Sequence, residues 1–275
     1  MTWLIVNGSA LGDGSNTRDN HARAHTSRVL AFPHPVEPSE NQVNFTKTSK
    51  AMALNQPLLD LLTASQVERV YMDHGTGARS NISVFQAELM SIPQGAYMVG
   101  QVAVPAHTNA IPPSSVILVW PLVPRDGYGN LIMPPTGYEM IWNDKRSGGK
   151  QNGSFWRPQP PYGYMALGDV ACNGHDPPST QFTAKYACIR GDLLSEGALD
   201  TVALWTDQGS GASMNVSIWN VKGNGLGGFF KAHAGYNRPT YQSFVLPAKV
   251  SKMAVKQPAE SGQYYPHPQG FAFPY

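Results

Sequence analysis

Short runs of β-branched and aromatic residues, separated by turn-forming residues, recur along most of the chain. Val67, Arg69 and Tyr71 open one such run, and another spans residues 116–120. This pattern is typical of short strands joined by turns. Residues 57–65 differ, because Pro57 stands at a plausible first helical position before a short leucine face. The pattern therefore predicts an all-β chain with one short helix.

One strand of this kind leads into a motif that occurs three times. Counted from an aspartate, a glycine follows after four residues, an asparagine after eight, a serine after ten and an aromatic after twelve. The matching residues are Asp73, Asp144 and Asp207; Gly77, Gly148 and Gly211; Asn81, Asn152 and Asn215; Ser83, Ser154 and Ser217; and Phe85, Trp156 and Trp219. Three copies in register indicate an internal triplication.

Each motif predicts a strand, a tight turn and a second strand. The aspartate can accept hydrogen bonds from turn amides, the asparagine can do the same for a second bend, and the aromatic can pack in the core. Three such sheets, each with one apolar face, can bury those faces around a pseudo-threefold axis. We therefore expect a β-prism of three antiparallel sheets, with about four short strands in each unit.

The chain divides into three parts by composition. We expect an irregular N-terminal arm (1–50), the triplicated β-prism domain (51–247) and a tail rich in Pro, Tyr and Phe (248–275). The repeats are expected at about 67–123, 138–192 and 200–247. The arm or the tail could join copies of the chain into a homo-oligomer. His21 and His25 are four apart, but no apolar periodicity makes that segment the helix a metal site would need.

Composition excludes several classes of function. The 275 residues carry 14% charged residues and a net charge of +2, which is too small to indicate nucleic acid binding. Cys172 and Cys188 form neither a disulfide framework nor a metal-binding pair; they could bond to each other, but two small buried apolar residues are the simpler interpretation. We expect no metal and no cofactor. The apolar start, 1–6, is too short for a signal sequence, so we expect a soluble protein that is cytoplasmic or released by a non-classical route.

Several strings together resemble the vacuolar protein sorting-associated protein 62 family of plants and fungi, over about residues 67–247. They are WNDKRSGG at 142–149, SFWRP at 154–158, GYMALGDV at 163–170, PPS at 177–179 and CIR at 188–190. The resemblance implies a prism related to membrane-associated β-prism domains, which occur in sorting proteins and as targeting domains of some pore-forming toxins. It implies no catalytic residues. One departure is Lys145-Arg146, which stands where the sister turns have His74-Gly75 and Gln208-Gly209.

The polar residues of the three turns are the candidate binding residues. Carboxylates, amides and basic side chains suit sugar hydroxyls or lipid headgroups. The candidates are Asp73, His74, Asn81, Asp144, Lys145, Arg146, Lys150, Asn152, Asp207 and Asn215. Alternatively, the aspartates and asparagines only close turns, and the basic residues are ordinary solvated surface. Turn aspartates and asparagines more often close turns than bind ligands, whereas for the basic residues neither interpretation is favoured.

We therefore expect a non-enzymatic recognition module that binds glycans or membrane lipid headgroups through loops at the prism corners, with peripheral membrane contact. The alternative is a toxin or effector, possibly pore-forming or oligomeric, that uses the prism to reach a membrane. An enzyme is disfavoured, because three similar sites are common in lectins whereas catalysis usually needs one asymmetric set of residues.

Overall fold

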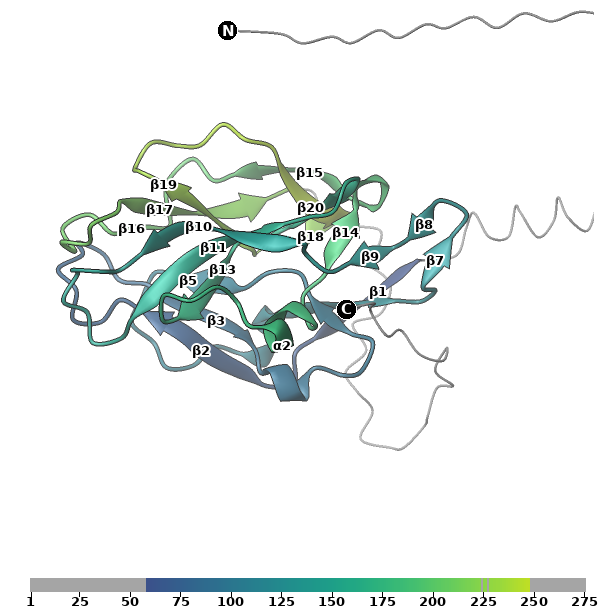
Figure 1. Ribbon diagram of the computed structural model, residues 1–275, viewed down its shortest axis with the longest axis horizontal. Coiled ribbons are helices and arrows are strands. Elements are labelled where there is room, and N and C mark those ends of the chain that lie inside the picture. The colour runs from purple at the N-terminus through teal and green to yellow at the C-terminus, as the bar shows by residue number, and fades with distance from the viewer. Residues whose placement is uncertain (1–57, 224, 227, 248–275) are drawn as a thin grey trace, which may run out of the picture. The chain divides into compact units, whose positions relative to one another are not determined.

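The computed structural model describes residues 58–223, 225–226 and 228–247 (Figure 1). The N-terminal arm, the tail and the pair His21 and His25 lie outside the described residues. The described part consists of strands in antiparallel sheets, with one short α-helix. The expected all-β fold is therefore confirmed.

Six strands recur in the same order three times. In each set of six, the second, third and fifth strands pair with one another, and so do the first, sixth and fourth. These two groups are separate sheets in units one and two, whereas in unit three the first strand also pairs with the third and joins them into one six-stranded sheet. Unit one contains β1 (Leu59–Thr63), β2 (Val67–Met72), β3 (Ser83–Ala87), β4 (Tyr97–Met98), β5 (Val102–Val104) and β6 (Ile117–Pro121). Unit two contains β9 (Ile132–Met133), β10 (Gly137–Asn143), β11 (Gly153–Gln159), β12 (Tyr164–Met165), β13 (Val170–Asn173) and β14 (Cys188–Arg190). Unit three contains β15 (Ser195–Leu199), β16 (Trp205–Thr206), β17 (Val216–Lys222), β18 (Gly225–Leu226), β19 (Phe230–Ala234) and β20 (Ser243–Pro247).

A small hairpin separates units one and two and projects from the sheets beside β9 (Figure 1). Its strands are β7 (Arg125–Asp126) and β8 (Gly129–Asn130). The Arg190 guanidinium holds it in place by pairing with Asp126 (2.7 Å) and Asp192 (2.6 Å). The remaining elements are short: the helix α2 (Thr180–Thr183) and the 3-10 turns Leu89–Ser91, Pro113–Ser115 and Gly191–Leu193.

The helix expected over residues 57–65 is wrong, because this segment forms strand β1. Leu59 and Leu61 are buried and Asp60 between them is half-buried, which is the two-residue period of a strand. The strand pairs with β6, from Leu59 opposite Pro121 to Thr63 opposite Ile117. Pairing with a distant strand overrides the local leucine pattern. The one α-helix of the described residues, α2, is instead capped by Ser179, whose hydroxyl accepts from the Phe182 amide.

The centre of the fold is a group of aromatic rings contributed by all three units. The residue two positions before each motif aspartate is aromatic and buried: Tyr71, Trp142 and Trp205. The Trp142 ring lies 6.1 Å from that of Tyr71 and 6.0 Å from that of Trp205, and Phe155 packs among them. Irregularities in the β2–β3 and β10–β11 registers stand directly before Tyr71 and Trp142. A bulge of this kind re-aims the next side chain, here into the shared core.

Candidate functional site

The three motif turns share one backbone arrangement. In each, the aspartate carbonyl accepts from the amide three residues on: Thr76 (3.1 Å), Ser147 (2.9 Å) and Ser210 (2.8 Å). The aspartate amide donates to the carbonyl nine residues on, at Ile82, Gly153 and Val216. The equal spacing that the sequence shows therefore corresponds to equal hydrogen bonding.

The turns do not stand apart as separate corners, because main-chain hydrogen bonds join them in a ring. The Arg79 amide donates to the Gln208 carbonyl (2.9 Å), the Ser213 amide to the Lys145 carbonyl (3.0 Å) and the Lys150 amide to the His74 carbonyl (2.9 Å). Each bond links the sixth residue after one aspartate to the first residue after another.

Glycine permits this close approach. A Cβ on Gly77 would lie 2.6 Å from the Gly209 carbonyl oxygen, and one on Gly209 would lie 2.8 Å from that of Gly77. Such contacts are shorter than any side chain tolerates, so the motif glycine is required by packing between turns in unit one. We call the joined turns, residues 73–82, 144–153 and 207–216, the loop end.

The motif aspartates are buried beneath the loop end, at 2%, 4% and 2% exposure for Asp73, Asp144 and Asp207. Asp73 accepts from the Ile82 amide and from the Trp205 indole N–H (both 3.0 Å). Asp207 accepts in the same way from the Val216 amide (2.9 Å) and the Trp142 indole N–H (3.0 Å). The carboxylates thus close their own turn and bind an indole from another unit.

The corresponding position between units one and two differs, because a tyrosine stands there in place of a tryptophan. Tyr71 occupies the place of the indoles and faces Asp144, but its hydroxyl is buried without a hydrogen-bond partner among the described residues. Gly153 replaces the larger Ile82 and Val216 because a Cβ there would lie 2.2 Å from the Tyr71 ring. Burial, and then the charges of Asp144 and the other two aspartates, raise the pKa of Tyr71 far above its usual value. The phenol therefore stays protonated.

Two histidines, which the sequence interpretation missed, contact two of the buried carboxylates. His107 Nε2 lies 2.7 Å from Asp73 Oδ1, and His175 Nε2 lies 2.6 Å from Asp144 Oδ1. Both follow the last strand of their sheet, β5 or β13. In unit three, Tyr236 takes this place and donates to Asn215 Oδ1 (3.1 Å). No local motif links these residues to the turns, so their role appears only in three dimensions.

The remaining predicted site residues are exposed. Within the described part of the chain, Asn81 and Asn152 make no side-chain hydrogen bond, so their amides do not close a second bend as expected. The exposed candidates are His74, Asn81, Lys145, Arg146, Lys150, Asn152 and Asn215. Arg79 is a further exposed basic residue, and it aligns with Lys150 six positions after the aspartate. That alignment was the signal that could have identified it.

The chemistry of the loop end follows from the separation of its buried acidic side chains from its exposed basic ones. Its carboxylates are turned inward and bonded, while Arg79, Lys145, Arg146 and Lys150 face solvent. The exposed acids nearest in sequence are Glu68 on β2 and Glu139 on β10, each five residues before a motif aspartate and outside the loop end. No group of three or more metal-binding side chains occurs among the described residues. The surface is therefore suited to anions.

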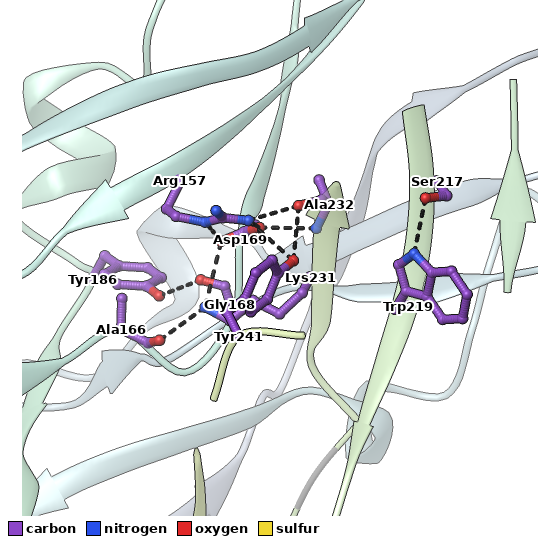
Figure 2. Close-up of polar contacts among 10 residues, drawn as sticks. All are labelled: Arg157, Ala166, Gly168, Asp169, Tyr186, Ser217, Trp219, Lys231, Ala232 and Tyr241. Carbon is purple, nitrogen blue, oxygen red and sulfur yellow. Dashed lines mark hydrogen bonds and ion pairs between the residues drawn. The ribbon is translucent and has the colours of Figure 1, made fainter. Parts of the chain in front are cut away.

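A second polar cluster lies inside the interface of units two and three, away from the loop end (Figure 2). Asp169 is fully buried between Arg157 (2.9 Å) and Lys231 (3.4 Å). Burial lowers the pKa of Lys231 despite the neighbouring carboxylate. Arg157 also contacts the Ala232 carbonyl and stacks over the ring of Tyr241. Every charged group here has a protein partner, which indicates a structural role.

The two cysteines are packing residues. Both are free thiols, with Cys188 buried and Cys172 partly buried. Their packing among apolar side chains matches the simpler interpretation of the sequence.

Comparisons with known proteins agree with this fold. The structure is similar to that of GNIP1Aa from Chromobacterium piscinae, with a TM-score of 0.56 and 23% sequence identity. The match covers 79% of this chain but only 41% of that one, so the chain spans less than half the length of its structural relative. No curated protein matches in sequence. The sequence signature of vacuolar protein sorting-associated protein 62 matches residues 26–234, more than half of the chain. The chain therefore belongs to the vacuolar protein sorting-associated protein 62 family.

Proposed function

We propose that the protein is a non-enzymatic recognition module whose loop end binds the anionic headgroups of a membrane. The observation that carries the proposal is the separation of charge at the loop end. Three carboxylates point inward and are hydrogen-bonded, while four basic side chains are exposed above them. Among the described residues, Lys145, Arg146 and Lys150 have no hydrogen-bond or ion-pair partner for their charged groups. Their charges remain available to a ligand.

Peripheral contact is the mode that fits this arrangement. The four-residue α2 is the only α-helix in the described ranges, and a helix that crosses a bilayer needs about 20 residues. A basic residue close to an anionic membrane contributes about 1 kcal/mol to binding. Four of them suffice for reversible adsorption that weakens as salt screens the charges.

Vesicle sedimentation tests the proposal. The full chain is expected to pellet with vesicles that contain anionic lipid, to stay in solution with neutral vesicles, and to be released by salt. Replacing Lys145 and Lys150 with Gln is expected to weaken binding about 30-fold, since two charges contribute about 2 kcal/mol. The control is Arg125→Gln with Lys222→Gln, which removes the same charge from the β7 hairpin and from the end of β17 far from the loop end.

Equal binding to neutral and anionic vesicles, or equal loss in both double variants, would contradict the proposal. Two further arms address the other expectations. Binding to immobilised glycans, with no preference for anionic vesicles, would favour a lectin. Release of a trapped dye from vesicles would favour a pore-forming protein.

A further inference from the structure

Arg146 occupies a backbone position that its sister turns give to glycine. The second residue after each aspartate has a positive φ: 87° at Gly75, 75° at Arg146 and 90° at Gly209. Arg146 is the only non-glycine residue with positive φ among the described residues. Left-handed backbone is unfavourable for a side chain such as arginine, and glycine adopts it freely.

No contact with the described residues accounts for this strain. Arg146 is exposed, and its guanidinium has no partner within the described ranges. The main chain here is part of the ring of turns, because the Lys145 carbonyl directly before Arg146 accepts from the Ser213 amide (3.0 Å). The turn fixes the backbone, and the side chain adds nothing to its stability. A strained residue at an exposed site is a reason to look for a function.

Two neighbouring lysines add positive charge beside Arg146. Lys145 precedes it and Lys150 follows four residues later in the same turn. The stem of Lys150 packs against unit one, since a Cβ on Gly75 would lie 2.9 Å from its Cγ. Ammonium groups attract anions in general, whereas the planar guanidinium can bind two oxygens of one phosphate at once.

We propose that Arg146 determines the specificity of the loop end and that it binds a phosphomonoester, the terminal phosphate of a lipid headgroup. This inference rests on the proposed membrane function and names the ligand class for it. A phosphomonoester presents three terminal oxygens and up to two negative charges, and a phosphodiester presents one charge on two oxygens. Both groups offer the two oxygens that a bidentate contact needs, but the monoester offers three such pairs and carries more charge on them, so Arg146 favours the monoester, while the lysines add attraction to either.

Vesicles of equal surface charge, containing phosphatidic acid or phosphatidylserine, test the proposal with four proteins. Wild type is expected to prefer phosphatidic acid on the order of tenfold, the range of one charge-assisted contact. Arg146→Lys keeps the charge and is expected to lose that preference. Arg146→Gly restores the sister backbone, so it is expected to raise Tm by about 2–4 °C and to bind both vesicles equally and weakly. Lys150→Gln is the control, expected to weaken binding to both lipids alike.

The outcomes separate the two proposals. If wild type binds neither vesicle, the membrane function itself fails. If wild type binds both without preference, or if Arg146→Lys keeps the preference, the role of Arg146 is overturned while membrane binding stands. A Tm of Arg146→Gly at or below wild type overturns the strain argument. Competition by soluble glycerol phosphate at concentrations comparable with lipid phosphate would show that a free phosphomonoester, not a lipid surface, is the ligand.

Discussion

At the scale of single residues, each unit uses the same positions with different chemistry. The indoles of Trp142 and Trp205 donate to the carboxylates of other units, whereas Tyr71 has no such hydrogen bond among the described residues. A buried acceptor that loses its donor retains the cost of desolvation. Chemically similar truncations at these positions should therefore differ in their effect.

We expect Trp205→Phe to destabilise the protein by about 3–5 kcal/mol, because Asp73 and the Ser80 carbonyl lose their donor and a cavity remains. Tyr71→Phe removes only a hydroxyl without a partner and is expected to change stability by less than about 1 kcal/mol. Urea unfolding of both variants measures the difference. Equal losses would show that ring packing alone matters at these positions.

The cysteines make a second prediction at this scale. Burial raises the pKa of Cys172 and of Cys188 to about 12. Both thiols stay protonated below that pH, and the thiolate is the reactive form. At pH 8 the native protein is expected to react with iodoacetamide on the order of a thousandfold more slowly than free cysteine. Mass spectrometry follows the reaction, and unfolding in guanidinium is the control that should expose both thiols. Rapid native labelling of Cys172 would contradict the burial argument.

At the scale of elements, the interfaces between units are equivalent in geometry but not in charge. In the interface of units one and two, the Ala171 amide donates to Gln101, which also donates to Gln86. In the interface of units two and three, Asp169 takes the place of Gln101 and accepts from the Ala232 amide (2.8 Å). Arg157 takes the place of Gln86. The same backbone therefore accepts a neutral pair or an ionic one.

Removing one charge from the ionic interface should be costly. We expect Asp169→Asn to destabilise the protein by about 3–5 kcal/mol, because Arg157 and Lys231 lose their shared anion. The combined change Arg157→Gln, Asp169→Gln and Lys231→Val copies the residues of the neutral interface and is expected to stay within about 2 kcal/mol of wild type. Thermal and urea unfolding compare them. A combined variant as unstable as Asp169→Asn would show that shape, and not charge, sets the cost.

The sequence predicts elements well where the signal is local. The hairpin β10–β11 was found because its aspartate, glycines and aromatics lie within a dozen residues. The leucines of strand β1 indicate a helix by themselves, because the partner strand β6 lies more than 50 residues away and only the pairing reveals the two-residue period. Two-residue strands such as β4 and β12 carry too little pattern to be recognised, so each unit has six strands where about four were expected.

At the scale of the whole molecule, the antiparallel β-prism could be predicted, and the arrangement of its site could not. The sequence placed Lys145, Arg146 and Lys150 in one turn, but not the burial of the aspartates beneath them. His107 and His175 lie 34 and 31 residues from the carboxylates that they contact. Such contacts depend on how the sheets meet, which no short motif encodes.

The ring of turns also has a consequence for how the chain folds. Its closing contact joins Trp205 to Asp73 across 132 residues, and Arg79 to Gln208 beside it. A chain emerging from the ribosome cannot complete the ring until β16 has been synthesised. Until then, the first two units lack their contacts with unit three. Contacts so distant in sequence slow folding, because the entropy of closure is lost before the contacts form. Unit three therefore completes the fold: once it is synthesised, three hairpins that are marginal by themselves can form one cooperative structure.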